Sequence, residues 1–389
     1  MDLYFAFGTY QFFNVINLKL HEYKNEQADL LMTDCFPKAK VFYERAVESG
    51  LFENVWLLQA SFIDEVFEKS LILSEPNDNF FRKLNNKLTR NFQKYILFAT
   101  EKQYRSYPFY KKRYGRIFIA GMVQGLEYYL LYQIFKRKSK LFIYEDGTAQ
   151  LVPNSSFAIS PSDRIKDFFG FKQVKQHISG MYLYAPEHIS IKYHCPIIKQ
   201  QPPSEIEAMK KIYHYDIKDD YLATHNGIYI GSGYSAYLSR SVFGNLGSIE
   251  KEIVEENSSI LNQNNFIVKY HPSAKLTFEH VEDEIRDVLI PYEALGLFSK
   301  MDDKILIGIS STALYVPKFI YNQEPYLIFI HRLLFSNISD DLKKYIEYQE
   351  EYRVAEIIYD TIYRGYHNKN KIFAPETKEE FKKILEDIL

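Results

Sequence analysis

Short apolar stretches alternate with amphipathic stretches along most of this 389-residue chain. In the first half, five stretches rich in β-branched and aromatic residues are predicted strands: 2–7, 28–34, 54–59, 116–120 and 140–144. Helical patterns lie between them, for example at 10–21, 38–49 and 122–137. Strands joined by crossover helices build parallel sheets that are buried on both faces. The first half is therefore predicted to be a doubly wound α/β domain.

The same rhythm returns after a proline-rich segment at Pro196 to Glu207. Its run Gln200-Gln201-Pro202-Pro203-Ser204-Glu205 is predicted to be a linker leading into a capped helix, because consecutive prolines disfavour regular structure. Further strands are predicted near 227–231, 265–270, 305–309 and 326–330. Helical or irregular stretches are expected around 235–262 and 276–300.

The length of the chain also favours more than one domain, because a single hydrophobic core rarely grows this large. We predict a Rossmann-like domain at 1–200, a second one at 201–337, and C-terminal helices at 338–389 that pack back on the first domain. Two Rossmann-like domains that face each other across a cleft form the α/β architecture called GT-B.

The composition excludes several classes of protein. A net charge of -2 gives no general attraction to nucleic acid. Basic clusters at Lys111–Arg113 with Arg116 and at Lys136–Lys138 with Lys140 fit helix ends or a peripheral contact with anionic lipid. Cys35 and Cys195 are the only cysteines, too few for a disulfide framework, which favours the reducing cytoplasm. The start has no signal-peptide pattern and no apolar run reaches 18 residues, so we expect peripheral membrane contact at most.

Three polar motifs each follow a predicted strand. Glu145-Asp146-Gly147 comes after the strand at 140–144, His271-Pro272 after 265–270, and Ser310-Ser311-Thr312 after 305–309. In open α/β sheets ligands bind beyond the carboxyl ends of the strands, which is where these motifs are predicted to lie. Taken alone, each motif is more often structural than functional.

The first motif supplies a general base. Adjacent side chains leave a strand on opposite faces, so we expect one carboxylate to face the ligand while the other fixes the turn. Glu145 is assigned as the base and Asp146 is the alternative. Gly147 permits a tight turn or a close approach to a ligand, and Gly8-Thr9, after the first strand, lies at the same kind of position.

The other motifs supply an acid and an anion-binding turn. His271, with its backbone restricted by Pro272, can donate a proton or hydrogen bond to a departing phosphate. Ser310-Ser311-Thr312 reads as a turn that starts a helix, where backbone N–H groups and hydroxyls bind phosphate. Between them, Glu293 can accept hydrogen bonds from both hydroxyls of a ribose.

With these motifs in this order, the chain resembles the bacterial sialyltransferases of GT-B fold, which share an Asp/Glu-Asp/Glu-Gly, a His-Pro and a Ser-Ser or Ser-Thr motif. The start, Phe7-Gly8-Thr9-Tyr10-Gln11-Phe12-Phe13-Asn14-Val15-Ile16, is similar to that of glycosyltransferase family 52, with Tyr10 where that family often has proline. The polysialyltransferase and family 80 groups are related.

The resemblance implies roles for the residues that match it. Glu145 would be the base and His271 the acid, on an acceptor-side first domain and a nucleotide-binding second domain. Ser310 and Ser311 would bind phosphate and Glu293 the ribose. The loop Gly231-Ser232-Gly233, after the strand at 227–231, would lie near the nucleotide phosphate.

The resemblance also implies an activity. It is an inverting transfer of sialic acid from CMP-sialic acid to a hydroxyl of a cell-surface glycan, lipooligosaccharide or capsule, with galactose as the expected terminal sugar. No cofactor or metal is expected, and the sequence has no Asp-x-Asp motif. We expect a cytoplasmic protein, with a peripheral contact on the inner membrane and a homodimer left open.

Two alternatives remain open. One is a GT-B glycosyltransferase that uses a UDP-sugar, and the other is a non-catalytic protein of glycan assembly that keeps the cleft only for binding. Acceptor and linkage are expected to depend on first-domain loops such as 75–90 and 150–180.

Overall fold

The computed structural model describes residues 1–59, 105–121, 126–151, 173–189, 191–236, 242–271, 274, 277–286 and 289–389. Loop 75–90 and most of 150–180 lie outside these ranges, and so does Pro272. The chain divides into two compact units. Unit 1 is formed by Met1–Asp146, Pro153–Pro186 and Ser190–Glu205, and unit 2 by Gly147–Val152, Glu187–Ile189 and Ile206–Leu389.

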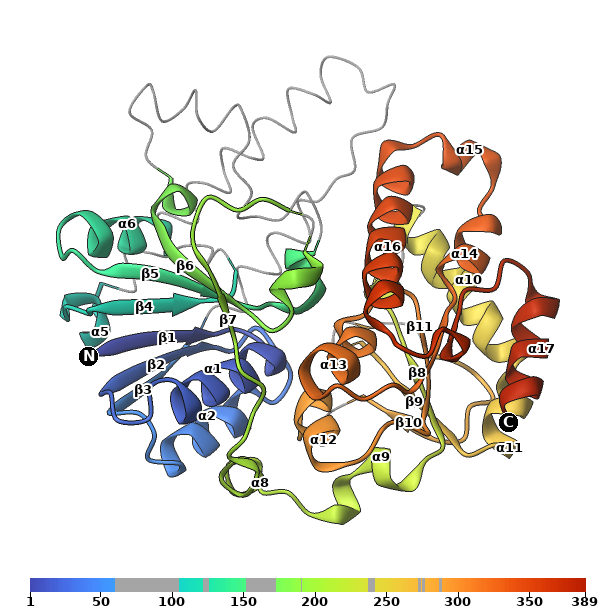
Figure 1. The fold of residues 1–389 in the computed structure, drawn as a ribbon, viewed down its shortest axis with the longest axis horizontal. Coiled ribbons are helices and arrows are strands. Elements are labelled where there is room, and N and C mark those ends of the chain that lie inside the picture. The colour runs from blue at the N-terminus through green and yellow to red at the C-terminus, as the bar shows by residue number, and fades with distance from the viewer. Residues whose placement is uncertain are drawn as a thin grey trace. The chain divides into compact units, whose positions relative to one another are not determined.

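Unit 1 is built on a seven-stranded parallel sheet in the order β3-β2-β1-β4-β5-β6-β7 (Figure 1). Its strands are β1 (Asp2–Ala6), β2 (Ala28–Thr33), β3 (Asn54–Leu58), β4 (Arg116–Ile119), β5 (Lys140–Tyr144), β6 (Ile178–Leu183) and β7 (Ile197–Lys199). The five strands predicted in this region are confirmed. Residues of β1, β2 and β4 are almost all buried, as expected for parallel strands covered on both faces.

Helices cover the sheet of unit 1, and their apolar residues fill its core. The described helices are α1 (Thr9–His21), α2 (Ala39–Glu48), α5 (Pro108–Lys111) and α6 (Glu127–Phe135), with the 3-10 turn η2 (Val174–His177). The turn η3 (Pro186–His188) begins in unit 1, and its other two residues belong to unit 2. Tyr4 of β1 stacks on Phe118 of β4 with ring centroids 4.6 Å apart. The ring of Phe118 in turn stacks on Phe142 of β5, so the aromatic residues of central strands form a continuous layer.

Unit 2 contains a second parallel sheet, of six strands in the order β10-β9-β8-β11-β12-β13 (Figure 1). The strands are β8 (Gly227–Ile230), β9 (Phe266–Lys269), β10 (Glu284–Ile285), β11 (Ile305–Gly308), β12 (Tyr326–Phe329) and β13 (Ile372–Phe373). The four longer strands match the predicted positions. The predicted fold class, α/β with two Rossmann-like domains, is therefore confirmed by the two parallel sheets.

The helices of unit 2 lie between its strands and after them. They are α8 (Ile206–Tyr213), α9 (Tyr221–Thr224), α10 (Val242–Glu256), α11 (Ser258–Gln263), α12 (Tyr292–Phe298), α13 (Thr312–Tyr321), α14 (His331–Ser336), α15 (Asp340–Lys343), α16 (Ile346–Gly365) and α17 (Lys378–Ile388). Short 3-10 turns are η1 (Gly147–Gln150), η4 (Ile217–Asp219), η5 (Gly233–Ala236) and η6 (Lys369–Lys371).

The C-terminal segment contributes to the core of unit 2, where Ala355 of α16 and Phe381 and Leu385 of α17 are buried. Strand β13 also pairs with β12 of the second sheet. The reason for this packing is the amphipathic face of α17, whose apolar residues are buried against the sheet that β13 extends. The expectation that the helices of 338–389 pack back on the first domain stays a prediction. Within the described part of the chain, none of the helices has the length and apolarity that a membrane span requires.

Candidate functional site

The carboxylate of Glu145 is enclosed by hydrogen-bond donors at the end of β5. Its side chain is 2% exposed. The Tyr10 hydroxyl donates to Oε1 at 3.0 Å, and the Tyr184 backbone N–H donates to Oε2 at 2.9 Å. The Asn14 amide donates to the Glu145 carbonyl at 3.0 Å. Each carboxylate oxygen thus accepts a hydrogen bond from within unit 1, which fixes the side chain.

Asp146 is more accessible than its neighbour and is held by Gln11. The side chain is partly exposed, and its Oδ1 accepts a hydrogen bond from Gln11 Nε2 at 3.0 Å. Gln11 Oε1 accepts from the Phe7 backbone N–H at 2.8 Å, so the amide presents its donor to the carboxylate. Burial raises the pKa of Asp146 above its usual range, and the Gln11 hydrogen bond opposes that rise.

The N-terminus of α1 brings these contacts to the carboxylates. Gly8 precedes the helix in an extended conformation, with open space where a side chain would lie, and Thr9 is its first residue. The side chains that touch the carboxylates are those of Tyr10 and Gln11, which sequence reasoning did not assign to the site. Their position is a consequence of sheet order, because only β4 separates β1 from β5.

Gly147 belongs to unit 2 and needs to be glycine. Its φ is +66°, and a Cβ atom there would lie 2.1 Å from Thr312 Oγ1. The next residue, Thr148, donates its backbone N–H to Thr312 Oγ1 at 3.2 Å. Thr312, predicted to bind nucleotide, therefore has its hydroxyl against this turn.

His271 follows β9 by two residues and keeps part of its surface exposed to solvent. Desolvation of the rest of the ring, followed by the positive charge of Lys269, lowers the pKa of His271 to about 4. The imidazole is therefore neutral at pH 7. A Cβ atom on Gly233 would lie 3.7 Å from His271 Cε1, so the loop after β8 runs directly beside the ring.

The third motif forms the N-terminus of α13 at the end of β11. Ser311 is the N-cap residue, and its hydroxyl oxygen accepts a hydrogen bond from the Ala313 backbone N–H at 3.3 Å. Ser310 and Ser311 are both partly exposed. The first N–H groups of this ten-residue helix carry the positive end of its dipole, which favours an anion.

Glu293 lies in the first turn of α12 and is 8% exposed. Burial raises its pKa, and the positive charge of Lys269 opposes that rise. Burial likewise lowers the pKa of the Lys269 ammonium, opposed by Glu293. Lys269 was not among the predicted site residues, although its place at the end of β9, two residues before His271, is the signal that could have identified it.

The loop at Gly231-Ser232-Gly233 is present, but Ser232 does not point its donors outward. The Ser232 backbone N–H donates to Glu250 Oε1 at 2.8 Å, and its hydroxyl donates to Glu250 Oε2. Gly231 donates its N–H to the Lys269 carbonyl at 2.9 Å. The loop is thus fixed on one side by α10 and on the other by β9.

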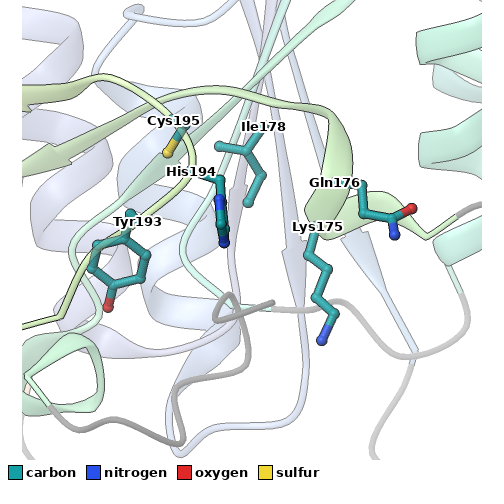
Figure 2. A pocket seen from close by; sticks show the side chains of 6 residues that line it. All are labelled: Lys175, Gln176, Ile178, Tyr193, His194 and Cys195. Atoms are coloured by element: carbon teal, nitrogen blue, oxygen red, sulfur yellow. The ribbon is translucent and has the colours of Figure 1, made fainter. Parts of the chain in front are cut away.

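A recess in unit 1 lies at the end of the strands opposite to Glu145 and Asp146. Lys175, Gln176, Ile178, Tyr193, His194 and Cys195 line it (Figure 2). Ile178 begins β6 and pairs with Leu141, three residues before β5 ends, so the recess is at the amino end of the strands. Burial raises the pKa of the Cys195 thiol, which disfavours the reactive thiolate. No predicted site residue lines this recess.

Among the described residues no group of three His, Cys, Asp or Glu side chains is placed to hold a metal ion. The expectation that the reaction requires no metal stays a prediction.

Comparison with known proteins gave matches to solved structures only, since no family model and no curated protein matches the chain. Arabidopsis thaliana UGT89C1 complexed with UDP-L-rhamnose is 11% identical with a TM-score of 0.42, over 100% of this chain and 98% of that one. An E. coli structure named trehalose-6-phosphate, bound with UDP-2-fluoro glucose, is 9% identical with a TM-score of 0.38, over 100% and 99%. An alpha,alpha-trehalose-phosphate synthase (UDP-forming) from Burkholderia vietnamiensis is 8% identical with a TM-score of 0.36, over 100% and 97%.

Proposed function

We propose that this protein is an inverting glycosyltransferase that moves sialic acid from CMP-sialic acid to a hydroxyl of a cell-surface glycan. The observation that carries the proposal is the position of the three polar motifs. Each follows the carboxyl end of an interior strand, namely β5, β9 and β11. Open α/β sheets bind ligands beyond the carboxyl ends of their strands, and the motifs supply a base, a phosphate partner and a helix N-terminus there.

Of the two carboxylates, the geometry favours Asp146 as the base and Glu145 as its structural neighbour. Glu145 is almost fully buried, and both of its oxygens accept hydrogen bonds from unit 1. Asp146 retains solvent exposure, and burial raises its pKa, which makes the carboxylate more basic. This reverses the order assigned from the sequence, where Glu145 came first. A general base has to reach the proton of the acceptor hydroxyl, and Asp146 meets that requirement better.

The leaving nucleotide is proposed to be stabilised by hydrogen bonds rather than by a charged acid. With a pKa of about 4, His271 is neutral at pH 7 and donates an imidazole N–H. A phosphate monoester has a second pKa of about 6, so the departing CMP does not need full protonation. Ser310, Ser311 and the N-terminus of α13 add donors, and Glu293 accepts hydrogen bonds from the ribose.

The reaction is a single displacement at the anomeric carbon. Asp146 takes the proton of the acceptor hydroxyl as the oxygen forms a bond to that carbon, and the bond to the phosphate oxygen breaks on the opposite face. The electron pair leaves with CMP, and the anomeric configuration inverts. The acceptor we favour is a galactose-terminated lipooligosaccharide or capsule.

The test is nucleotide release from the purified full-length protein, supplied with lactose and with either CMP-sialic acid or UDP-glucose. We expect acceptor-dependent release of CMP and a loss of about 10²–10³-fold in kcat for His271→Ala, the usual effect of removing one hydrogen-bond donor to a developing negative charge. The matched control is His194→Ala in the recess of unit 1, which we expect to leave kcat unchanged. Release from UDP-glucose alone would replace the sialyl donor with a UDP-sugar, and binding of donor without turnover would indicate a non-catalytic protein.

A further inference from the structure

The loop after β8 forms a wall beside the His271 imidazole. A Cβ atom on its first residue, Gly231, would lie 3.4 Å from the Lys269 carbonyl oxygen and 3.5 Å from Tyr270 Cα, so the loop backbone is in contact with the end of β9. Two residues on, a Cβ atom on Gly233 would lie 3.8 Å from both ring nitrogens of His271. The backbone of the loop therefore lies against the histidine, and a shift of this loop changes the space in which the ring is held.

One buried carboxylate fixes this loop from the other side. Glu250, in the middle of α10, is 0% exposed. Its Oε1 accepts hydrogen bonds from the Ser232 N–H at 2.8 Å and the Tyr229 hydroxyl at 3.2 Å, while Oε2 accepts from the Ser232 hydroxyl. Ser232 Oγ accepts in turn from the Tyr234 N–H at 3.1 Å. The carboxylate thus organises both the end of β8 and the turn that follows it.

A buried carboxylate at this position is costly unless hydrogen bonds compensate it, and here three donors do so. Burial raises the pKa of Glu250, and the hydrogen bonds from Ser232 and Tyr229 oppose that rise, so the same contacts that hold the loop also stabilise the carboxylate. A second carboxylate reinforces the turn, because Glu351 of α16 accepts a hydrogen bond from the Tyr234 hydroxyl at 2.9 Å. The resemblance implies that Ser232 lies near the nucleotide phosphate, which stays a prediction, and its contacts with Glu250 make it an anchor of the loop.

We propose that Glu250 is a positioning residue for His271, acting through the loop Gly231–Tyr234. By fixing Ser232, it keeps the backbone of Gly233 against the imidazole and so sets the direction in which the ring meets the leaving phosphate. This inference rests on the proposed role of His271. It makes Glu250 important for catalysis without any contact with the substrate.

The experiment compares Glu250→Gln with Glu252→Gln in the full-length protein. The amide introduced by Glu250→Gln can offer an oxygen to only part of the Ser232 and Tyr229 donors, so the loop is loosened. Glu252 is an exposed residue of the same helix that pairs with Lys378 at the surface, and it serves as the matched control. Two readouts are measured, the titration of the His271 ring by NMR and kcat for donor cleavage.

By NMR we expect His271 to titrate at a pKa of about 4 in the wild type and in Glu252→Gln. In Glu250→Gln the pKa should rise toward its ordinary value of about 6.5, because a loosened loop admits water to the ring. The His271 signal is assigned by its absence in His271→Ala. This readout needs no activity, so it decides the inference even if the proposed reaction is not found.

In the kinetic assay, misplacement of the ring should lower kcat of Glu250→Gln by up to about 10²-fold. The double variant with His271→Ala should be no slower than His271→Ala alone, since the carboxylate acts through the histidine. An unchanged titration, or a loss of kcat that adds fully to that of His271→Ala, overturns the proposal. If Glu250→Gln does not fold, Ser232→Ala is tested with the same readouts and the same expected directions.

Discussion

Exchanging each carboxylate of Glu145-Asp146 for its amide should separate stability from catalysis. In Glu145→Gln the new side chain keeps one oxygen, which can accept from the Tyr184 N–H. Its NH₂ group then meets the Tyr10 hydroxyl, whose oxygen can accept that hydrogen bond but whose O–H loses the carboxylate as its acceptor. In Asp146→Asn the remaining oxygen can still accept the hydrogen bond from Gln11 Nε2. The first exchange therefore disrupts a buried network, whereas the second removes a proton acceptor.

The magnitudes follow from these contacts. A buried donor left without a partner costs about 1–3 kcal/mol, which corresponds to roughly 2–12 °C in Tm at 2–4 °C per kcal/mol for a domain of this size. Loss of a general base costs about 10²–10⁴ in kcat, equivalent to about 2.7–5.4 kcal/mol in the activation barrier. We expect Glu145→Gln to show the first effect with near-normal kcat. Asp146→Asn should show the second effect with a Tm close to that of the wild type.

The stability assay is thermal unfolding followed by tryptophan fluorescence. Trp56 is the only tryptophan and lies on β3, so the signal reports on unit 1 alone. Activity is measured as CMP release, and exposed Glu53→Gln is the control for removing a carboxylate from unit 1. If Asp146→Asn stays active while Glu145→Gln loses kcat without losing stability, Glu145 is the base and the reasoning from burial is refuted.

Three further predictions concern unit 2. Because the pKa of His271 is about 4, kcat/KM should not decline as pH rises from 5 to 8, and a falling limb near pH 6.5 that disappears in His271→Ala would contradict a neutral donor. Ser311→Ala should lower the free energy of unfolding by about 0.5–2 kcal/mol, because the hydrogen bond from the Ala313 N–H to the Ser311 hydroxyl is lost. A urea titration followed by far-UV CD measures this change. Gly147→Ala should cost roughly 2–5 kcal/mol, the sum of a left-handed backbone and a clash with Thr312. In the same titration, Gly147→Ala should cost less stability in a Thr312→Gly background, where the clash is removed and only the backbone cost remains. Equal losses of stability in the wild type and in the Thr312→Gly background would rule out the steric explanation.

The sequence predicted most of the fold because parallel strands are buried on both faces and leave continuous apolar runs. β1, β2, β4 and β5 carry such runs, and each was placed within one or two residues. β6, β7, β10 and β13 were not predicted. β7, β10 and β13 are only two or three residues long, and so short a run has no readable period. β6 is longer, but it includes Gly180 and polar Ser179, which interrupt the pattern.

The candidate site was only partly accessible to sequence reasoning. The end of a strand is visible in the sequence, so Glu145, Asp146 and His271 could be chosen as candidates and are found next to strand ends. Hydrogen-bond partners are not visible, because they come from segments distant in the chain. Gln11 is 135 residues from Asp146, and Glu250 is 18 residues from Ser232, in each case without a pattern that links them.

The sequence by itself thus determined the α/β class, the two sheets and the strand ends at which polar residues gather, because hydrophobic periodicity and turn residues are local properties. Tertiary structure decided which carboxylate is enclosed and which stays accessible, that His271 is neutral, and that Ser232 anchors its loop through Glu250. It also placed the C-terminal helices in the core of unit 2. Burial and hydrogen bonding depend on which segments fold against each other, and those contacts set the pKa and orientation of each side chain.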